Sequence, residues 1–165
     1  MRDDEPGTAS ISDIIPDRKA AESSPRVYTI GYQGRTPETF LKALKSNRVE
    51  RLVDVREIAR SRKPGFSSGA LSEFLSTNGI EYIHMKGLGS PREARRKLRE
   101  DNDFVSFSMS FESALEQRRS DLASLIDLAL EKPTAIMCFE RDPAECHRSI
   151  IAAKVQELGF DVMDL

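Results

Sequence analysis

Short β-forming runs alternate with longer amphipathic stretches from Arg26 onward, and this order constrains the fold more than any other feature of the chain. The runs expected to be strands are 27–30, 52–55, 81–84, 134–138 and 161–165. The stretches expected to be helices are 36–45, 71–75, one opening near 91, 107–118, 121–130 and 143–158. Thr36 is expected to cap the first of them, and Ser90 and Glu93 are expected to form a capping box at the start of the third. Such alternation is typical of a mostly parallel sheet covered by helices on both faces. We therefore predict an α/β fold, as a single domain over residues 26–165.

The first 25 residues differ from the rest of the chain in composition. They are rich in Asp, Glu, Ser and Pro, and their apolar content is largely a short cluster of Ile11, Ile14 and Ile15. A segment with so few apolar residues cannot bury a core, so we predict a disordered N-terminal tail. The spacing of the three isoleucines leaves a second interpretation open, in which one helical turn docks on the domain.

Charge and cysteine content set the expected environment. Two cysteines and no apolar leader do not make a secreted disulfide framework, and no apolar run approaches the roughly 20 residues that span a bilayer. We expect a cytoplasmic protein without a membrane partner. The net charge is only −2, so attraction of the whole molecule to nucleic acid is not expected. One basic face remains open, because basic residues predominate over 48–99, although the run Arg92–Arg99 equally suits a solvated helix face.

The residues that carry chemistry gather in one segment, Cys138–Arg148, which follows an apolar run. It contains both cysteines, one of the two histidines and two arginines. Asp142, Pro143 and Glu145 predict a helix start, with Asp142 as N-cap, Pro143 in the first helical position and Glu145 reaching back in a capping box. The residues after Glu145 then occupy the first helical turn.

That turn would contain Cys146, His147 and Arg148. Free backbone N–H groups and the helix dipole favour an anion or a thiolate there, so Cys146, His147 and Glu140 are our candidate catalytic residues. Cys146 as a small packed side chain is the alternative. Cys138, at the end of an apolar strand, is expected in the core, and a Cys138–Cys146 redox pair stays open.

Every unusual cluster in the chain follows a predicted strand. The clusters are Gly31–Arg35 after the first strand, Asp54 and Arg56 at the second, His84 at the third and Cys138–Glu140 at the fourth. Ligands of parallel sheets bind outside the carboxyl ends of the strands. The four segments therefore predict one shared site at that edge.

Three guanidiniums are expected at this site. Arg56 and Arg62 follow the second strand and Arg148 follows the fourth, and planar guanidinium forks suit phosphate or carboxylate. Gly31 allows the backbone to approach an anion closely. We predict that these residues bind a phosphate-bearing ligand.

Aromatic and acidic side chains complete the predicted binding site. Tyr32 and Phe66 could stack on a base, and the alternative is that Phe66 seals the edge of the core. Asp54 is a candidate for proton transfer or for holding the arginines in place. Cys138, Cys146 and the two histidines lack a recognised zinc spacing, so we expect neither a metal nor another cofactor.

Several motifs together resemble a known family. They are Thr29-Ile30-Gly31-Tyr32, Leu52-Val53-Asp54-Val55-Arg56, Ser61-Arg62-Lys63-Pro64-Gly65-Phe66, Gly79-Ile80-Glu81-Tyr82, Leu88-Gly89 and the Cys-x-Glu with Cys-His-Arg signature of Cys138–Arg148. This combination, over about residues 27–158, resembles the bacterial and archaeal family catalogued as domain of unknown function 488. The resemblance implies an α/β domain with a shared site at one edge, and it implies no particular reaction.

The strand ending at Arg56 is also similar to one in rhodaneses and related cysteine phosphatases. Those enzymes place a basic residue five or six positions after the reactive cysteine. Here those positions hold Pro143 and Ala144 counted from Cys138, and Ile151 and Ala152 counted from Cys146. Chemistry of that type is therefore disfavoured.

Two functions follow from these observations. The first is a small intracellular enzyme that acts on a phosphate-bearing substrate, a nucleotide or a nucleic acid, at the carboxyl edge of the sheet. The alternative is a non-catalytic module that binds nucleic acid or a protein through the same arginines. We expect the enzyme, because thiols, acids and arginines gathered at one edge are costly to assemble without a function.

Overall fold

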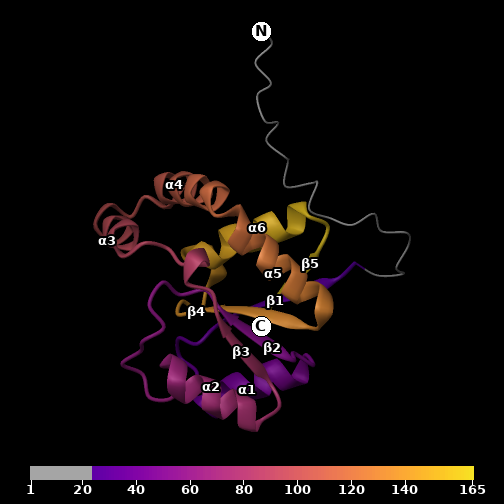
Figure 1. Ribbon diagram of the computed structural model, residues 1–165. Coiled ribbons are helices and arrows are strands. Elements are labelled where there is room, and N and C mark those ends of the chain that lie inside the picture. Colours follow the sequence, from indigo (N-terminus) through magenta and orange to yellow (C-terminus); the bar gives the residue numbers. More distant parts are fainter. Residues whose placement is uncertain (1–23) are drawn as a thin grey trace.

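A five-stranded parallel sheet forms the centre of the molecule in the computed structural model, which describes residues 24–165 (Figure 1). Its strands are β1 (Arg26–Gly31), β2 (Arg51–Asp54), β3 (Glu81–His84), β4 (Thr134–Cys138) and β5 (Asp161–Asp164), in the order β3-β2-β4-β1-β5. All neighbouring strands run parallel, which confirms the predicted α/β class. The predictions for residues 1–23, including the isoleucine cluster, lie outside the described residues.

Helices cover both faces of the sheet (Figure 1). They are α1 (Pro37–Ser46), α2 (Ser68–Thr77), α3 (Arg92–Asp101), α4 (Phe104–Gln117), α5 (Arg119–Glu131) and α6 (His147–Glu157), with short 3-10 turns η2 (Lys86–Leu88) and η3 (Pro143–Glu145). Helices α1 and α2 lie on one face, while α5 and α6 lie on the other with α4 and α3 beyond them. Within the described part of the chain, no helix has both the length and the apolar character needed to cross a membrane.

Alternation along the strands decides which side chains meet which helices. Ala135 and Met137 of β4 pack in the core with α1 and α2, whereas Ile136 and Cys138 point to the other core. That second core is built largely on α4, α5 and α6, and α4 contributes Phe111 with its neighbours one turn away on either side. Cys138 therefore ends a strand on the face that α6 covers.

The ends of the three central strands are in register. Gly31 pairs with Cys138 and Asp54 pairs with Met137, so the segments after β1, β2 and β4 leave the sheet side by side. Helix α1 follows β1 on one face, while α6 follows the adjacent β4 on the other. A crevice opens where neighbouring strands feed helices on opposite faces. The predicted edge is thus the natural place for a site.

A buried ion pair between Asp54 and Arg56 lies next to this edge. Asp54 is fully buried and receives hydrogen bonds from Arg56 Nε at 2.8 Å and Arg56 Nη2 at 2.5 Å. Burial acts to lower the pKa of Arg56, but the Asp54 carboxylate raises it above its usual value, so the guanidinium stays charged. Arg56 Nη1 also donates to the Tyr32 hydroxyl at 3.0 Å and to the Phe66 carbonyl at 2.9 Å. Tyr82 donates its hydroxyl to Asp54 at 2.6 Å, which brings β3 into the network.

Two of the helix starts differ from those predicted. Cys146 is the N-cap of α6, with extended backbone, and Asp142 caps the preceding turn η3 by accepting from the Ala144 amide at 2.9 Å. Cys146 therefore lies outside the first helical turn in which the sequence had placed it. The capping box expected at Ser90 is also absent, since Ser90 Oγ is buried without a partner among the described residues. The predicted cap of α1 at Thr36 is confirmed.

Substitution Arg56→Met should destabilise the domain strongly, because it leaves the Asp54 carboxylate buried without its counter-ion. We expect a loss of about 3–5 kcal/mol in the free energy of unfolding, measured by urea denaturation. The matched control is Arg96→Ala, which removes an exposed arginine paired with Glu93 and Glu100 and should cost no more than about 0.5–1 kcal/mol. Equal costs for the two variants would contradict the role assigned to the buried pair.

Candidate functional site

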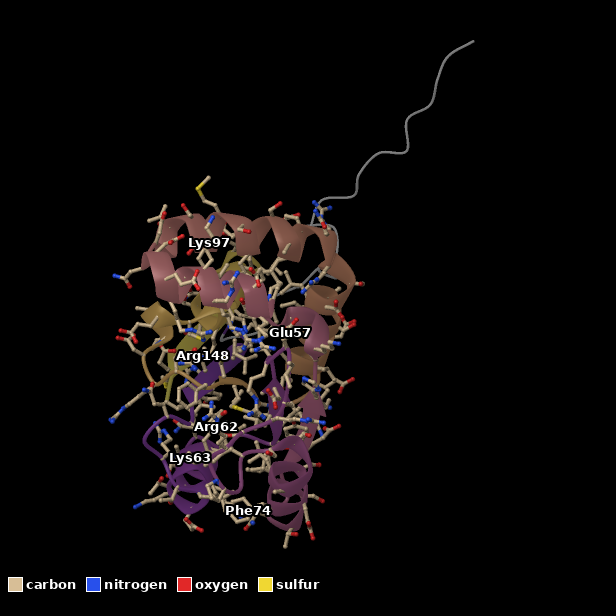
Figure 2. All side chains as sticks on the ribbon, turned by 90° about the vertical axis from the view of Figure 1, so that its left-hand side faces the viewer. Glu57, Arg62, Lys63, Phe74, Lys97 and Arg148 are labelled. Carbon is tan, nitrogen blue, oxygen red and sulfur yellow. The ribbon has the colours of Figure 1, made fainter. Side chains whose placement is uncertain are left out.

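The site lies at the edge of the sheet where the strands end, which faces the viewer in Figure 2. Arg148 lies near the centre of this view, Lys97 above it, and Arg62 and Lys63 below it. Chain segments from three strand ends and from α3, α4 and α6 contribute to the edge. The segment after β4 supplies most of the reactive groups.

Two thiols and one imidazole meet at the centre of the site. Cys138 Sγ, Cys146 Sγ and His147 Nδ1 all lie within 4.8 Å of one another. His147 Nδ1 is 3.8 Å from Cys138 Sγ and 3.7 Å from Cys146 Sγ. The three residues are buried, with exposed fractions of 4%, 2% and 3%. Both cysteines are free thiols, so the cluster is not a disulfide.

The imidazole of His147 is fixed from its far side. Its Nε2 lies 2.9 Å from the carbonyl oxygen of Val55, directly after β2. A carbonyl can only accept, so Nε2 carries a proton and the neutral ring presents the Nδ1 lone pair to the two sulfurs. Phe111 of α4 packs its ring edge against the imidazole at a centroid distance of 5.2 Å. The ring is therefore held in one orientation.

Glu140 lies next to the thiols and is positioned by its own backbone. Its Oε2 is 3.1 Å from Cys138 Sγ. Arg148 Nη1 donates to the Glu140 carbonyl at 3.0 Å and Nη2 to the Arg141 carbonyl at 3.4 Å. A Cβ added at Gly31 would lie 1.8 Å from the backbone carbonyl oxygen of Glu140, so only glycine allows the two segments to approach this closely. Gly31 thus positions the loop that bears Glu140.

A cavity of about 370 Å³ opens beside this cluster. Its lining residues are Arg95, Leu98, Arg99, Asn102, Phe104, Phe107, Glu140, Ala144, Glu145, Cys146 and His147. One wall carries the thiol, imidazole and carboxylate, and the opposite wall is formed by α3 and the start of α4. A second cavity, of about 160 Å³, lies between α3 and α4 and contacts none of the reactive groups.

Burial and mutual contact shift the pKa values of the cluster. The hydrogen bond with Cys146 lowers the pKa of Cys138 to about 6, against the effect of burial and with the help of His147. Burial, together with the charge on Cys138, raises the pKa of Cys146. Burial also acts to lower the pKa of His147, but the Cys138 sulfur raises it. The more acidic thiol is therefore Cys138, whereas the sequence had favoured Cys146.

Glu140 keeps its negative charge at neutral pH. Burial acts to raise its pKa, but hydrogen bonds with the neighbouring thiols and its own backbone lower it overall. A charged carboxylate therefore faces the cavity beside the two sulfurs.

The predicted anion-binding arginines divide into two groups. Arg56 and Arg148 are buried, and their guanidiniums bond to groups of the protein itself, Arg56 to Asp54 and Arg148 to two backbone carbonyls. Both guanidiniums are therefore engaged within the protein, and their binding of a ligand anion stays a prediction. Arg62 is exposed at the same edge and makes no hydrogen bond within residues 24–165, so it stays a candidate contact.

The predicted aromatic contacts are also used internally. Tyr32 and Phe66 are buried and stack on each other at a centroid distance of 4.5 Å, so neither offers a face to a base. Phe66 seals the core, which was the alternative interpretation. Asp54 holds Arg56 and does not reach the cavity, in line with its second proposed role.

Three site residues were missed from the sequence. Arg95 and Arg99 of α3 line the cavity, although the run to which they belong also suited a solvated face. Cys138 lies in the core, as predicted, and also belongs to the thiol cluster, which the sequence had left open only as a redox pair. The signal for the arginines was present as the strong basic run after Pro91, but sequence alone did not show which face of that helix meets the site.

The comparisons with known proteins give one match. The family model described as "Domain of unknown function DUF488" matches residues 36–155, which include most of the site. No curated protein and no solved structure matches the chain.

Substitution Gly31→Ala should displace the loop that carries Glu140, because the added methyl group would overlap the Glu140 carbonyl. We expect a loss of at least about 1–3 kcal/mol in unfolding free energy. Gly69→Ala is the control, since Gly69 lies in α2 with open space at its Cβ position and should gain about 0.5–1 kcal/mol. Urea denaturation measures both, and a neutral Gly31→Ala would show that the close approach is dispensable.

Proposed function

We propose a function from the geometry of the site, because the chain belongs to a family described only as "Domain of unknown function DUF488". The protein is a small enzyme that acts on a phosphate-bearing substrate, a nucleotide or nucleic acid, in the cavity at the carboxyl edge of the sheet. One observation carries this proposal. Cys146, His147 and Glu140 line the same cavity as two arginines of α3, Arg95 and Arg99.

The basic wall supplies the binding of the phosphate. Arg99 is exposed at the cavity and has no ion-pair partner within the described residues, so its guanidinium is available to a ligand. Arg95 donates to Glu57 at 3.1 Å, which fixes its position while the remaining N–H groups stay available. Guanidinium forks match the geometry of phosphate oxygens.

The remaining wall suits the apolar part of such a substrate. Phe104 and Phe107 contribute ring surface, and Leu98 adds an aliphatic contact. A cavity of about 370 Å³ is within the usual range for small-ligand sites, at the lower end. It can hold a sugar phosphate or one nucleotide of a longer chain.

The opposite wall supplies the reactive groups. Glu140 lines the cavity as a charged carboxylate, which suits it to accept a proton from an attacking group. Cys146 and His147 lie beside it and bring a sulfur and a nitrogen lone pair to the same place. These three residues are the proposed catalytic residues, and Cys138 joins them from β4.

The surface around the cavity favours the second candidate, a non-catalytic module that binds nucleic acid. Arg62, Lys63 and Lys97 lie on the same side of the molecule (Figure 2). A continuous chain of phosphates could contact them while one nucleotide enters the cavity. Binding without turnover distinguishes this candidate from the enzyme.

Substitution Arg99→Ala should weaken binding of the phosphate-bearing ligand about tenfold or more, the equivalent of roughly 1.5–3 kcal/mol for a charge-assisted contact. Calorimetric titration of mononucleotides, inorganic phosphate and short oligonucleotides, each at two salt concentrations, measures the loss. Arg92→Ala is the matched control, because Arg92 is exposed on the same helix and does not line the cavity. Equal binding by the two variants, or no binding by the wild type, would refute the assignment of the basic wall.

Substitution Glu140→Gln should abolish turnover while leaving ligand binding nearly intact, because the amide keeps the shape of the side chain and cannot accept the proton. The expected loss of rate is about 100-fold or more. Mass spectrometry of a nucleotide and oligonucleotide mixture after incubation with either protein detects products. Substrates bound by the wild type but never converted would favour the non-catalytic module.

A further inference from the structure

The three donor atoms at the centre of the site are spaced as metal ligands are. In a tetrahedral zinc site the metal lies about 2.3 Å from sulfur and about 2.0–2.1 Å from nitrogen, which places sulfur and nitrogen about 3.5 Å apart. The two sulfur–nitrogen distances here are 3.8 and 3.7 Å. Each sulfur–nitrogen distance therefore needs to shorten by only a few tenths of an ångström to hold an ion, and the two sulfurs lie within 4.8 Å of each other.

The surroundings hold these atoms as the supporting groups of a metal site do. His147 donates its Nε2 proton to the Val55 carbonyl, which leaves Nδ1 free to bind a cation. Ligating histidines usually donate their other N–H to a carbonyl or carboxylate in this way. The Arg148 amide lies 3.4 Å from Cys146 Sγ and donates to it, which supports a thiolate at that position.

Three groups that can carry a negative charge lie close together in the cluster. Cys138 Sγ and Glu140 Oε2 lie 3.1 Å apart, and Cys146 adds a second sulfur beside them. The guanidinium of Arg148 donates its Nη groups to backbone carbonyls, and no hydrogen bond from it to these atoms is found within the described residues. Two thiolates and a carboxylate at this spacing repel one another unless protons or a metal ion lie between them.

We propose that Cys138, Cys146 and His147 bind a transition-metal ion of the zinc class. Thiolate and imidazole ligands select zinc and its chemical relatives, while magnesium and calcium prefer oxygen ligands. The inference depends on the spacing of the ligand atoms and not on the identity of the substrate. It assigns a metal where the sequence predicted none.

A metal ion held by these three residues would have one position left for another ligand, and Cys146 and His147 both line the cavity. Three protein ligands with one open position are typical of catalytic zinc sites, whereas structural sites use four. Glu140 Oε2 lies 3.1 Å from Cys138 Sγ, so its carboxylate would be placed to accept a proton from a water molecule that such an ion activates. This arrangement would supply the nucleophile of the proposed enzyme.

The spacing of the ligands along the chain explains why a motif search misses them. Seven residues separate the two cysteines, and the histidine follows the second cysteine directly. The first ligand ends β4, and the other two lie at the start of α6 after the turn η3. Adjacent residues can both face the metal because Cys146 has extended backbone and His147 begins the helix.

The test is metal loading of the full-length protein, measured without substrate. Protein kept under a thiol-free reductant is incubated with Zn²⁺ or Co²⁺, freed of loosely bound ion by gel filtration and analysed for metal. We expect one equivalent per chain, and for Co²⁺ the visible bands of a tetrahedral ion together with a sulfur-to-metal charge-transfer band. Less than about a tenth of an equivalent in the folded, reduced protein, without that band, would overturn the proposal.

Variants locate the ion. Cys138→Ser and Cys146→Ser should each weaken Co²⁺ binding by more than the roughly 10- to 100-fold that loss of a supporting hydrogen bond costs. His84→Ala is the control, because His84 is the other histidine of the chain and lies at the end of β3, outside the cluster. Circular dichroism verifies folding, and a variant that fails to fold is replaced by counting thiols protected from alkylation in the zinc-loaded wild type. Metal binding that survives both substitutions, or no protected thiols, would place the ion elsewhere and refute the inference.

Because no substrate enters this measurement, its outcome is independent of the phosphate-binding experiment. If the protein binds metal but no phosphate, the metal site is supported and the proposed substrate class is refuted. Phosphate binding without metal would leave the enzyme proposal with its thiols and Glu140 alone.

Discussion

The buried ion pair between Asp54 and Arg56 holds the carboxyl edge of the sheet together. Asp54 ends β2 and binds Tyr82 of β3, while Arg56 reaches Tyr32 after β1 and the Phe66 carbonyl before α2. Removing two charges from water is costly, and good geometry with further hydrogen bonds is needed to offset that cost. The pair meets this condition because nearly every donor of Arg56 has a partner. It ties β3 and the segments that follow β1 and β2 together at this edge, next to the segment after β4 that bears most of the reactive groups.

The cluster of two thiols and one imidazole depends on this edge through one backbone group. Val55 lies between the two residues of the ion pair, and its carbonyl accepts the Nε2 proton of His147. Its amide in turn donates to the Met137 carbonyl at 3.1 Å, which joins it to β4 one residue before Cys138. The imidazole and the first thiol are therefore both positioned relative to β2. A shift of the ion pair would therefore move the imidazole and the first thiol, even though neither charged group contacts the cluster.

The sequence predicted the fold well because hydrophobic periodicity depends on local spacing. All five strands occur where β-forming runs were found, and the sites of chemistry lie at their ends. The roles of single residues were harder to predict. Arg56 and Arg148 have the composition of a phosphate site, and only their burial shows that they bind the protein itself. Cys146 was predicted in the first turn of the helix that starts at Pro143. The turn η3 ends at Glu145, so Cys146 is instead the N-cap of α6. In this N-cap position the sulfur of Cys146 lies near that of Cys138.

The two walls of the cavity differ in how firmly they belong to the fold. The reactive wall comes from β4 and α6, whose residues around the cluster are almost all buried. The basic wall comes from α3, which has no fully buried residue and meets the body through Ala94, Leu98 and the pair Arg95–Glu57. Substitutions on α3 therefore cost little core packing, whereas changes around the cluster disturb the sheet edge. For the proposed enzyme, the buried wall would set the chemistry, and the choice of substrate could change through α3 without loss of the fold.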